Sequence, residues 1–139
     1  MAEKKLLFVM LPMFFMLATS FGQGKKTIRE MGISSVTVQE YFLDEGMDEP
    51  VVESIEKYNE EGELIELQEF NKEGEVKTWE RYVYNSEGQL VEEIFLDERG
   101  RVEESEKNIY RGELRVEKQF FDNRGRMYKK KVYEYEYRD

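Results

Sequence analysis

The sequence lacks two of the residue types on which much of protein chemistry depends. Its 139 residues include no cysteine and no histidine, and only two prolines and one tryptophan. Without cysteine the chain cannot form disulfides, thiolate zinc sites, a thiol nucleophile or a lipidated N-terminal cysteine. Without histidine it has no imidazole metal ligand and no Ser-His or Cys-His nucleophile pair. Most familiar enzyme chemistries are therefore excluded, and the length predicts a single domain.

The first 22 residues have the pattern of a secretory signal peptide. Two lysines at positions 4 and 5 precede an uncharged apolar run from Leu6 to Leu17, and small residues follow up to Gly22. Cleavage after Gly22 fits this pattern best, and cleavage after Ser20 is the alternative. The competing interpretation is an uncleaved membrane anchor, but residues 6–22 are barely long enough to span a bilayer and include Pro12.

The charge balance predicts a protein that works outside the cytoplasm. Loss of residues 1–22 lowers the basic count from 21 to 19 and the acidic count from 31 to 30, which leaves a net charge of −11. Such a charge opposes binding to nucleic acid and to anionic lipid. We therefore expect an exported protein of the periplasm or cell surface, with no membrane insertion after cleavage.

Aromatic residues argue against a disordered chain. High charge and low hydrophobicity are typical of disorder, but residues 23–139 keep nine Tyr, five Phe and one Trp at regular intervals. We expect a lead-in over residues 23–33, with a short helical turn from Thr27 to Met31, and a folded domain over residues 34–139.

A short unit repeats along this domain. It consists of a large apolar residue, Asn or Asp, two polar residues, Gly, a polar residue and an aliphatic residue. From Gly62 the glycines follow at intervals of 12, 14, 12, 12 and 13 residues. The turn positions of the five full copies are Asn59 and Gly62, Asn71 and Gly74, Asn85 and Gly88, Asp97 and Gly100, and Asp122 and Gly125.

Each unit predicts a tight turn between two strands. Asn and Asp side chains bond to nearby backbone amides, and Gly supplies the positive φ that closes the turn. Strands joined by such turns must be antiparallel. The sequence therefore predicts an all-β antiparallel meander of about eight strands, built from 12–14-residue hairpin repeats as an extended or curled twisted sheet. A half-barrel or small sandwich is the alternative. The expected strands are 34–43, 51–58, 64–70, 76–84, 90–96, 102–110, 114–121 and 127–137.

The unit resembles the YD repeat of the rearrangement-hot-spot family, written roughly Y-x-Y-D-x-x-G-R-L. Residues 82–90 (YVYNSEGQL) match it with Asn for Asp and Gln for Arg, and residues 121–127 (FDNRGRM) keep the Asp, Gly and Arg. The similarity covers about residues 58–137. It implies β-hairpin repeats in secreted or surface proteins, some of them described as carbohydrate-binding. The large members form a shell around a toxin, a role that we do not expect for an array as short as this one.

Carboxylates are the only candidates for catalysis. A glycoside hydrolase would need a pair of them, and cross-strand pairs are available: Glu66 or Glu69 with Glu80, and Glu92 and Glu93 with Glu103 and Glu104. Solvated strand residues that keep the sheet soluble and its edges unpaired are the favoured explanation. The acidic turns match no calcium-binding motif. We therefore expect no enzyme, no cofactor and no specific calcium site.

Aromatic side chains are the better binding candidates. Five of them could form a binding platform on the sheet, since Tyr and Trp are favoured where sugars or proteins bind. These are Trp79, Tyr82, Tyr84, Tyr133 and Tyr135. The competing interpretation, which we favour, is that they form the core of the sheet. We expect a secreted, non-enzymatic interaction protein that binds a protein partner or assembles with itself, and the alternative is a carbohydrate-binding module.

Overall fold

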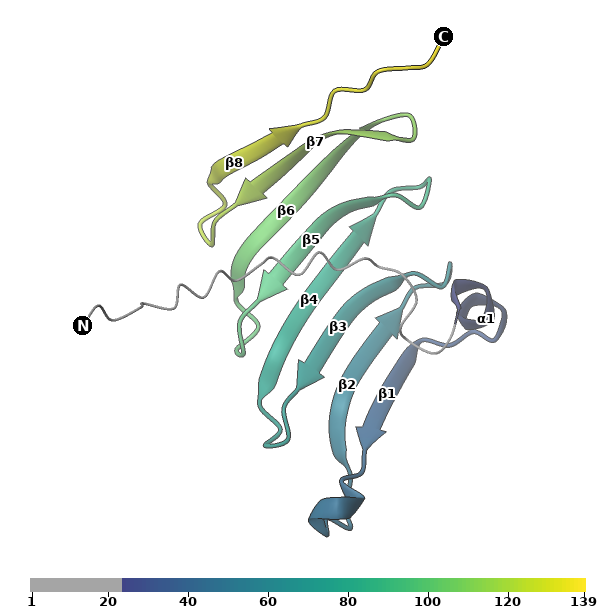
Figure 1. Cartoon of the computed structure of the whole chain (residues 1–139), viewed down its shortest axis with the longest axis vertical. Coiled ribbons are helices and arrows are strands. Elements are labelled where there is room, and N and C mark those ends of the chain that lie inside the picture. Colours follow the sequence, from purple (N-terminus) through teal and green to yellow (C-terminus); the bar gives the residue numbers. More distant parts are fainter. Residues whose placement is uncertain (1–23) are drawn as a thin grey trace, which may run out of the picture.

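A computed structural model describes residues 24–139 of the chain (Figure 1). The predicted signal peptide, residues 1–22, lies outside the described residues. The elements in chain order are α1 (Lys25–Glu30), β1 (Ser35–Glu40), the 3-10 helix η1 (Leu43–Glu45), β2 (Val51–Tyr58), β3 (Leu64–Phe70), β4 (Val76–Tyr84), β5 (Leu90–Leu96), β6 (Val102–Arg111), β7 (Leu114–Phe121) and β8 (Met127–Val132). No helix within residues 24–139 is long and apolar enough to cross a membrane.

The eight strands form one antiparallel sheet in the order β1-β2-β3-β4-β5-β6-β7-β8. Each strand pairs with its neighbours in the sequence, so the predicted meander is confirmed. Figure 1 shows the strands bowed and fanned in a single layer, with β1 at one edge and β8 at the other. The sheet does not close into a barrel, because β1 and β8 do not pair with each other.

Every hairpin contains a β-bulge near the start of its second strand. In the β3–β4 pair, Glu69 lies opposite Thr78 but Phe70 lies opposite Val76, so Lys77 is the extra residue. The other hairpins shift at the corresponding place. A bulge increases the local right-handed twist of a strand. Each hairpin therefore has its added twist at the corresponding place.

The bulges determine which side chains share a face. Cross-strand partners share a face and successive residues alternate, so Tyr82 and Tyr84 lie on one face and Trp79 on the other. We call these the tyrosine face and the tryptophan face. A strict alternation without the bulge would place Leu90 and Ile94 on the same face. Leu90 lies opposite Tyr84, however, and Ile94 lies opposite Arg81, so the two residues are on different faces.

The tyrosine face is the better buried one. Leu64, Leu67 and Tyr82 form its core cluster, and Tyr58, Tyr84 and Leu90 pack against them. The large apolar residues left exposed within the strands are mostly on the tryptophan face, among them Val83, Val102, Ile109 and Val132.

Helix α1 covers one end of the sheet, at the β2–β3 turn. Ile28 is 1% exposed, and Lys25 forms an ion pair with Glu63 of that turn at 3.0 Å. Gly62 makes this docking possible, because a Cβ there would lie 2.5 Å from the Lys25 carbonyl oxygen. The expected helical turn is thus a helix that begins and ends slightly earlier, at Lys25 and Glu30.

The first and last expected strands were too long. β1 ends at Glu40 because the chain turns into η1 at Leu43. β8 ends at Val132, and one further bond runs from the Tyr133 N–H to the Val116 carbonyl. Beyond it residues 134–137 leave the ladder, although β7 continues to Leu114.

Candidate functional site

The five full turns share one hydrogen-bond pattern. In the β5–β6 turn, the backbone N–H of Asp97 bonds to the Arg101 carbonyl, and the N–H of Gly100 bonds to the Asp97 carbonyl. The Asp97 Oδ1 accepts the N–H groups of Arg99 and Arg101, both at 2.9 Å. Gly100 has a φ of +77°, which the sequence analysis predicted for the glycine of each unit.

A side-chain pair closes each turn, and its chemistry depends on the turn residue. Asn59, Asn71 and Asn85 donate through Nδ2 to the side-chain oxygen of the residue four positions later, which is Glu63, Glu75 or Gln89. Where the turn residue is an aspartate, that position is an arginine: Arg101 after Asp97 and Arg126 after Asp122. The sequence analysis missed this pairing, although the complementary residue types are visible in the repeat.

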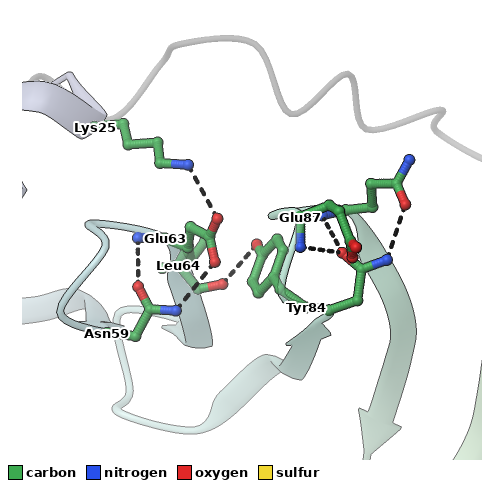
Figure 2. Close-up of polar contacts among 8 residues, drawn as sticks. Lys25, Asn59, Glu63, Leu64, Tyr84 and Glu87 are labelled. Atoms are coloured by element: carbon green, nitrogen blue, oxygen red, sulfur yellow. Dashed lines mark hydrogen bonds and ion pairs between the residues drawn. The ribbon is translucent and has the colours of Figure 1, made fainter. Parts of the chain in front are cut away.

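Tyrosines tie successive hairpins together at one end of the tyrosine face. The Tyr84 hydroxyl donates to the Leu64 carbonyl at 2.8 Å, and the Tyr110 hydroxyl to the Leu90 carbonyl at 2.9 Å. Tyr135 repeats the contact with the Arg115 carbonyl. Figure 2 shows the Tyr84 ring aimed at Leu64, beside the ion pair of Lys25 and Glu63. These hydroxyls are thus engaged within the sheet.

Trp79 stands alone among the five platform candidates. It lies half-buried on the tryptophan face, and its indole N–H donates to Glu66 at 2.9 Å. The ring lies over the β5–β6 turn, where a Cβ on Gly100 would come within 3.0 Å of it. It also lines a shallow hollow with Lys77, Leu96, Asp97, Glu98, Arg101 and Glu103.

The structure does not gather the five candidates into one surface. Tyr82 and Tyr84 lie on the tyrosine face, and Tyr82 is only 6% exposed. Tyr133 and Tyr135 follow β8 at the far edge, where the Arg115 guanidinium stacks over the Tyr133 ring at 4.6 Å. Whether any of these residues binds a ligand remains a prediction.

The candidate carboxylates divide between the two faces in the same way. Glu66 lies opposite Arg81 on the tryptophan face, whereas Glu80 lies on the tyrosine face and accepts the Tyr82 hydroxyl at 2.5 Å. Glu93 lies directly opposite Glu106, and Lys118 pairs with both. Burial, together with the neighbouring carboxylates Glu69 and Glu106, raises the pKa of Glu80 although the Tyr82 hydroxyl lowers it. Burial likewise raises the pKa of Glu93, against the opposing effect of Lys118.

Glu56 is the most buried carboxylate on this face. Its side chain is 2% exposed, and the Tyr58 hydroxyl donates to one of its oxygens, while Oε1 has no hydrogen-bond partner. No group of three acidic side chains in the described part of the chain is arranged to hold a metal ion.

The two edges of the sheet carry unpaired backbone groups. The Tyr58 N–H bonds to the Ser34 carbonyl, so in the alternating ladder Ser35 and Thr37 direct their N–H and C=O groups away from β2. By the same reasoning from the Tyr133–Val116 bond, Lys130 and Val132 of β8 direct theirs away from β7. Edges of this kind can accept a further strand.

The two edges differ in charge. β8 carries three consecutive lysines, Lys129 to Lys131, and all its residues are exposed. The Lys129 ammonium lies 4.0 Å from the Phe120 ring centroid. β1 has the sequence SVTVQE and no basic residue.

Comparison with protein-family models and with curated proteins finds no match for the chain. The proposals for its function therefore rest on the features of the sheet described above.

Proposed function

We propose that the protein is a non-enzymatic interaction module that binds through the open edges of its sheet. The observation that carries the proposal is the unpaired outer side of β1 and of β8. Strand addition at such an edge needs only free backbone groups, and alternate side chains then supply specificity.

The internal bonding of the other candidate groups supports this function. The hydroxyls of Tyr82, Tyr84 and Tyr135 and the indole N–H of Trp79 all bond within the chain. The carboxylates Glu80 and Glu93 are held by Tyr82 and Lys118. The outward backbone groups of the two edges take no part in these contacts.

The resemblance to the YD repeat supports a location outside the cytoplasm. Together with the predicted signal peptide and the net charge of −11, it supports an exported protein of the periplasm or cell surface. The repeat would then serve as a compact scaffold that presents its two edges.

Site-specific photo-cross-linking in producing cells tests the proposal. A photoreactive amino acid is placed at Gln39 of β1 or at Lys130 of β8, and as controls at Glu73 or Glu98 in exposed turns. We expect adducts from the edge positions and none from the turns. Adducts from the turns alone, or no adducts from either edge, would contradict the proposal.

Carbohydrate binding is the second candidate, and the hollow beside Trp79 favours it. An aromatic ring next to Asp97, Glu98 and Arg101 offers a stacking surface and polar partners for a sugar. A glycan array probed with the purified protein, with and without calcium, tests it. Hits that Trp79→Ala abolishes would support a sugar site, whereas a silent array from a folded sample would remove it.

A further inference from the structure

The difference between the two edges indicates which edge strand binds a partner and what that partner is. Lysines on an edge strand keep other strands from pairing with it. β8 has three of them, whereas β1 has none and presents Val36, Thr37 and Val38, which are residues that favour strands. β1 is thus the edge left open to pairing.

We propose that β1 pairs antiparallel with β1 of a second copy of this chain, in a two-fold symmetric dimer. The proposal rests on the proposed edge-binding function and names its partner. In this pairing Ser35 and Thr37 of one copy bond to Thr37 and Ser35 of the other, since these residues direct their backbone groups outward. Val36 then faces its own counterpart across the symmetry axis.

The charges at the two ends of β1 complement each other in this arrangement. Before β1 comes α1 with the exposed Lys25, Lys26 and Arg29, of which Lys25 pairs with Glu63 and Lys26 with Glu30. After β1 comes the segment 44–49 with the exposed Asp44, Glu45, Asp48 and Glu49, of which Glu45 pairs with Lys72. Figure 1 places α1 and this segment at opposite ends of β1. An antiparallel pairing about Val36 therefore brings the basic helix of each copy toward the acidic segment of the other.

The same symmetry fails at β8. An antiparallel β8 pair centred on Lys130 would set Lys129 opposite Lys131 of the other copy, and like charges directly opposite each other destabilise a sheet. The dimer therefore ends in two lysine-bearing edges. It closes after two copies, as most homo-oligomers do, whereas pairing of β8 with β1 would extend without limit.

A proline substitution in each edge strand distinguishes dimerisation through β1 from association through β8. The whole chain, as the expressing cell processes it, is compared with Thr37→Pro and with the matched control Lys130→Pro by sedimentation equilibrium. Each substitution removes one outward N–H and no bond within the sheet. We expect twice the monomer mass for the wild type and Lys130→Pro, and a twofold lower mass for Thr37→Pro with an unchanged circular dichroism spectrum.

A single cysteine supplies a second test that does not depend on proline tolerance. The chain has no cysteine, and residues opposite each other in a non-hydrogen-bonded antiparallel pair are close enough for a disulfide. Val36→Cys should give a disulfide-linked dimer under mild oxidation, at a rate well above that of Lys131→Cys.

Three results would overturn the proposal: a wild-type monomer at all concentrations, a dimer that survives Thr37→Pro, or a dimer lost only with Lys130→Pro. In each case the cross-linking experiment still decides on the proposed function. Adducts of Gln39 with other proteins would keep edge binding and remove self-association, whereas no adducts at either edge would remove both.

Discussion

Asp97 and Arg101 lie four residues apart and hold one turn with both backbone and side chain. The Asp97 carboxylate accepts the Arg101 N–H at 2.9 Å through Oδ1 and the Arg101 guanidinium at 2.7 Å through Oδ2. In the β2–β3 turn the Glu63 N–H likewise donates to the Asn59 Oδ1, but the side-chain bond is reversed, because the Asn59 Nδ2 donates to the Glu63 carboxylate. The repeat thus uses two kinds of turn residue with complementary partners, which are Asn with Glu or Gln and Asp with Arg.

Exchange of one partner should break the turn, and exchange of both should restore it. Asp97→Asn brings an amide donor against the Arg101 guanidinium, which is also a donor, so we expect a lower melting temperature. Asp97→Asn combined with Arg101→Glu recreates the pair seen at Asn59 and Glu63 and should recover most of the loss. Thermal unfolding of the single and double variants measures the coupling, and strictly additive effects would contradict it.

Loss of the Tyr84 hydroxyl should cost about 1–3 kcal/mol of unfolding free energy, because the part-buried Leu64 carbonyl is left without its donor. Tyr84→Phe, measured by urea denaturation, is compared with Tyr137→Phe, whose ring is 80% exposed. The control should change nothing. Burial, with the charges of Glu63 and Glu93, also raises the pKa of Tyr84 to about 12, so an absorbance titration should show one fewer late-ionising tyrosine in Tyr84→Phe.

Two alanine substitutions at equivalent glycines should differ in cost. Gly62 and Gly74 have nearly the same φ, +80° and +79°, so both lose the same conformational freedom. Only at Gly62 does the new Cβ meet backbone, at 2.5 Å from the Lys25 carbonyl oxygen. We expect Gly62→Ala to destabilise the protein more than Gly74→Ala and to expose α1 to limited proteolysis. Equal melting temperatures for the two variants would show that α1 is not held at this turn.

Stability should be highest in mildly acidic solution. Glu80 and Glu93 have pKa values raised above 4.5, so the folded state binds their protons more tightly than the unfolded state. Their ionisation therefore lowers stability as the pH rises from 4.5 through the raised values. Backbone and side-chain bonds from Arg101 and Arg126 lower the pKa values of Asp97 and Asp122 below 3.8, so stability falls as the pH drops through those values.

The variant Glu80→Gln tests the expected loss of stability as the pH rises above 4.5. It keeps an acceptor for the Tyr82 hydroxyl but carries no charge, so it should unfold at a higher urea concentration than the wild type at neutral pH. Below pH 4.5 the two proteins should converge. A difference that does not depend on pH would indicate altered packing rather than the cost of a buried charge.

The sequence predicted most of the fold because the repeat is local. Six of the eight strands match their expected bounds to within one residue, since most of these bounds lie beside a glycine turn of the repeat. The faces were harder to predict. The extra residue in each hairpin, such as Lys77, reverses the alternation without any distinctive residue type to mark it.

The candidate site was less predictable because it depends on contacts between distant residues. Tyr84 and Leu64 are 20 positions apart, and their bond requires the register of the β3–β4 pair. The ion pairs of Lys118 with Glu93 and Glu106 join three strands. Composition alone could suggest that aromatic and carboxylate side chains are important, but not that they form hydrogen bonds with one another.

The single-layer order of the strands also bears on how the molecule unfolds. Each strand pairs only with its neighbours in the sequence, so the loss of one strand removes pairing only from the strands next to it. Amide hydrogen exchange should therefore be graded along the chain, fastest in the fully exposed β8 and slowest around Leu64, Leu67 and Tyr82. The stability of such a protein depends on the number of its hairpins, and each added or deleted hairpin would change the melting temperature by a further increment.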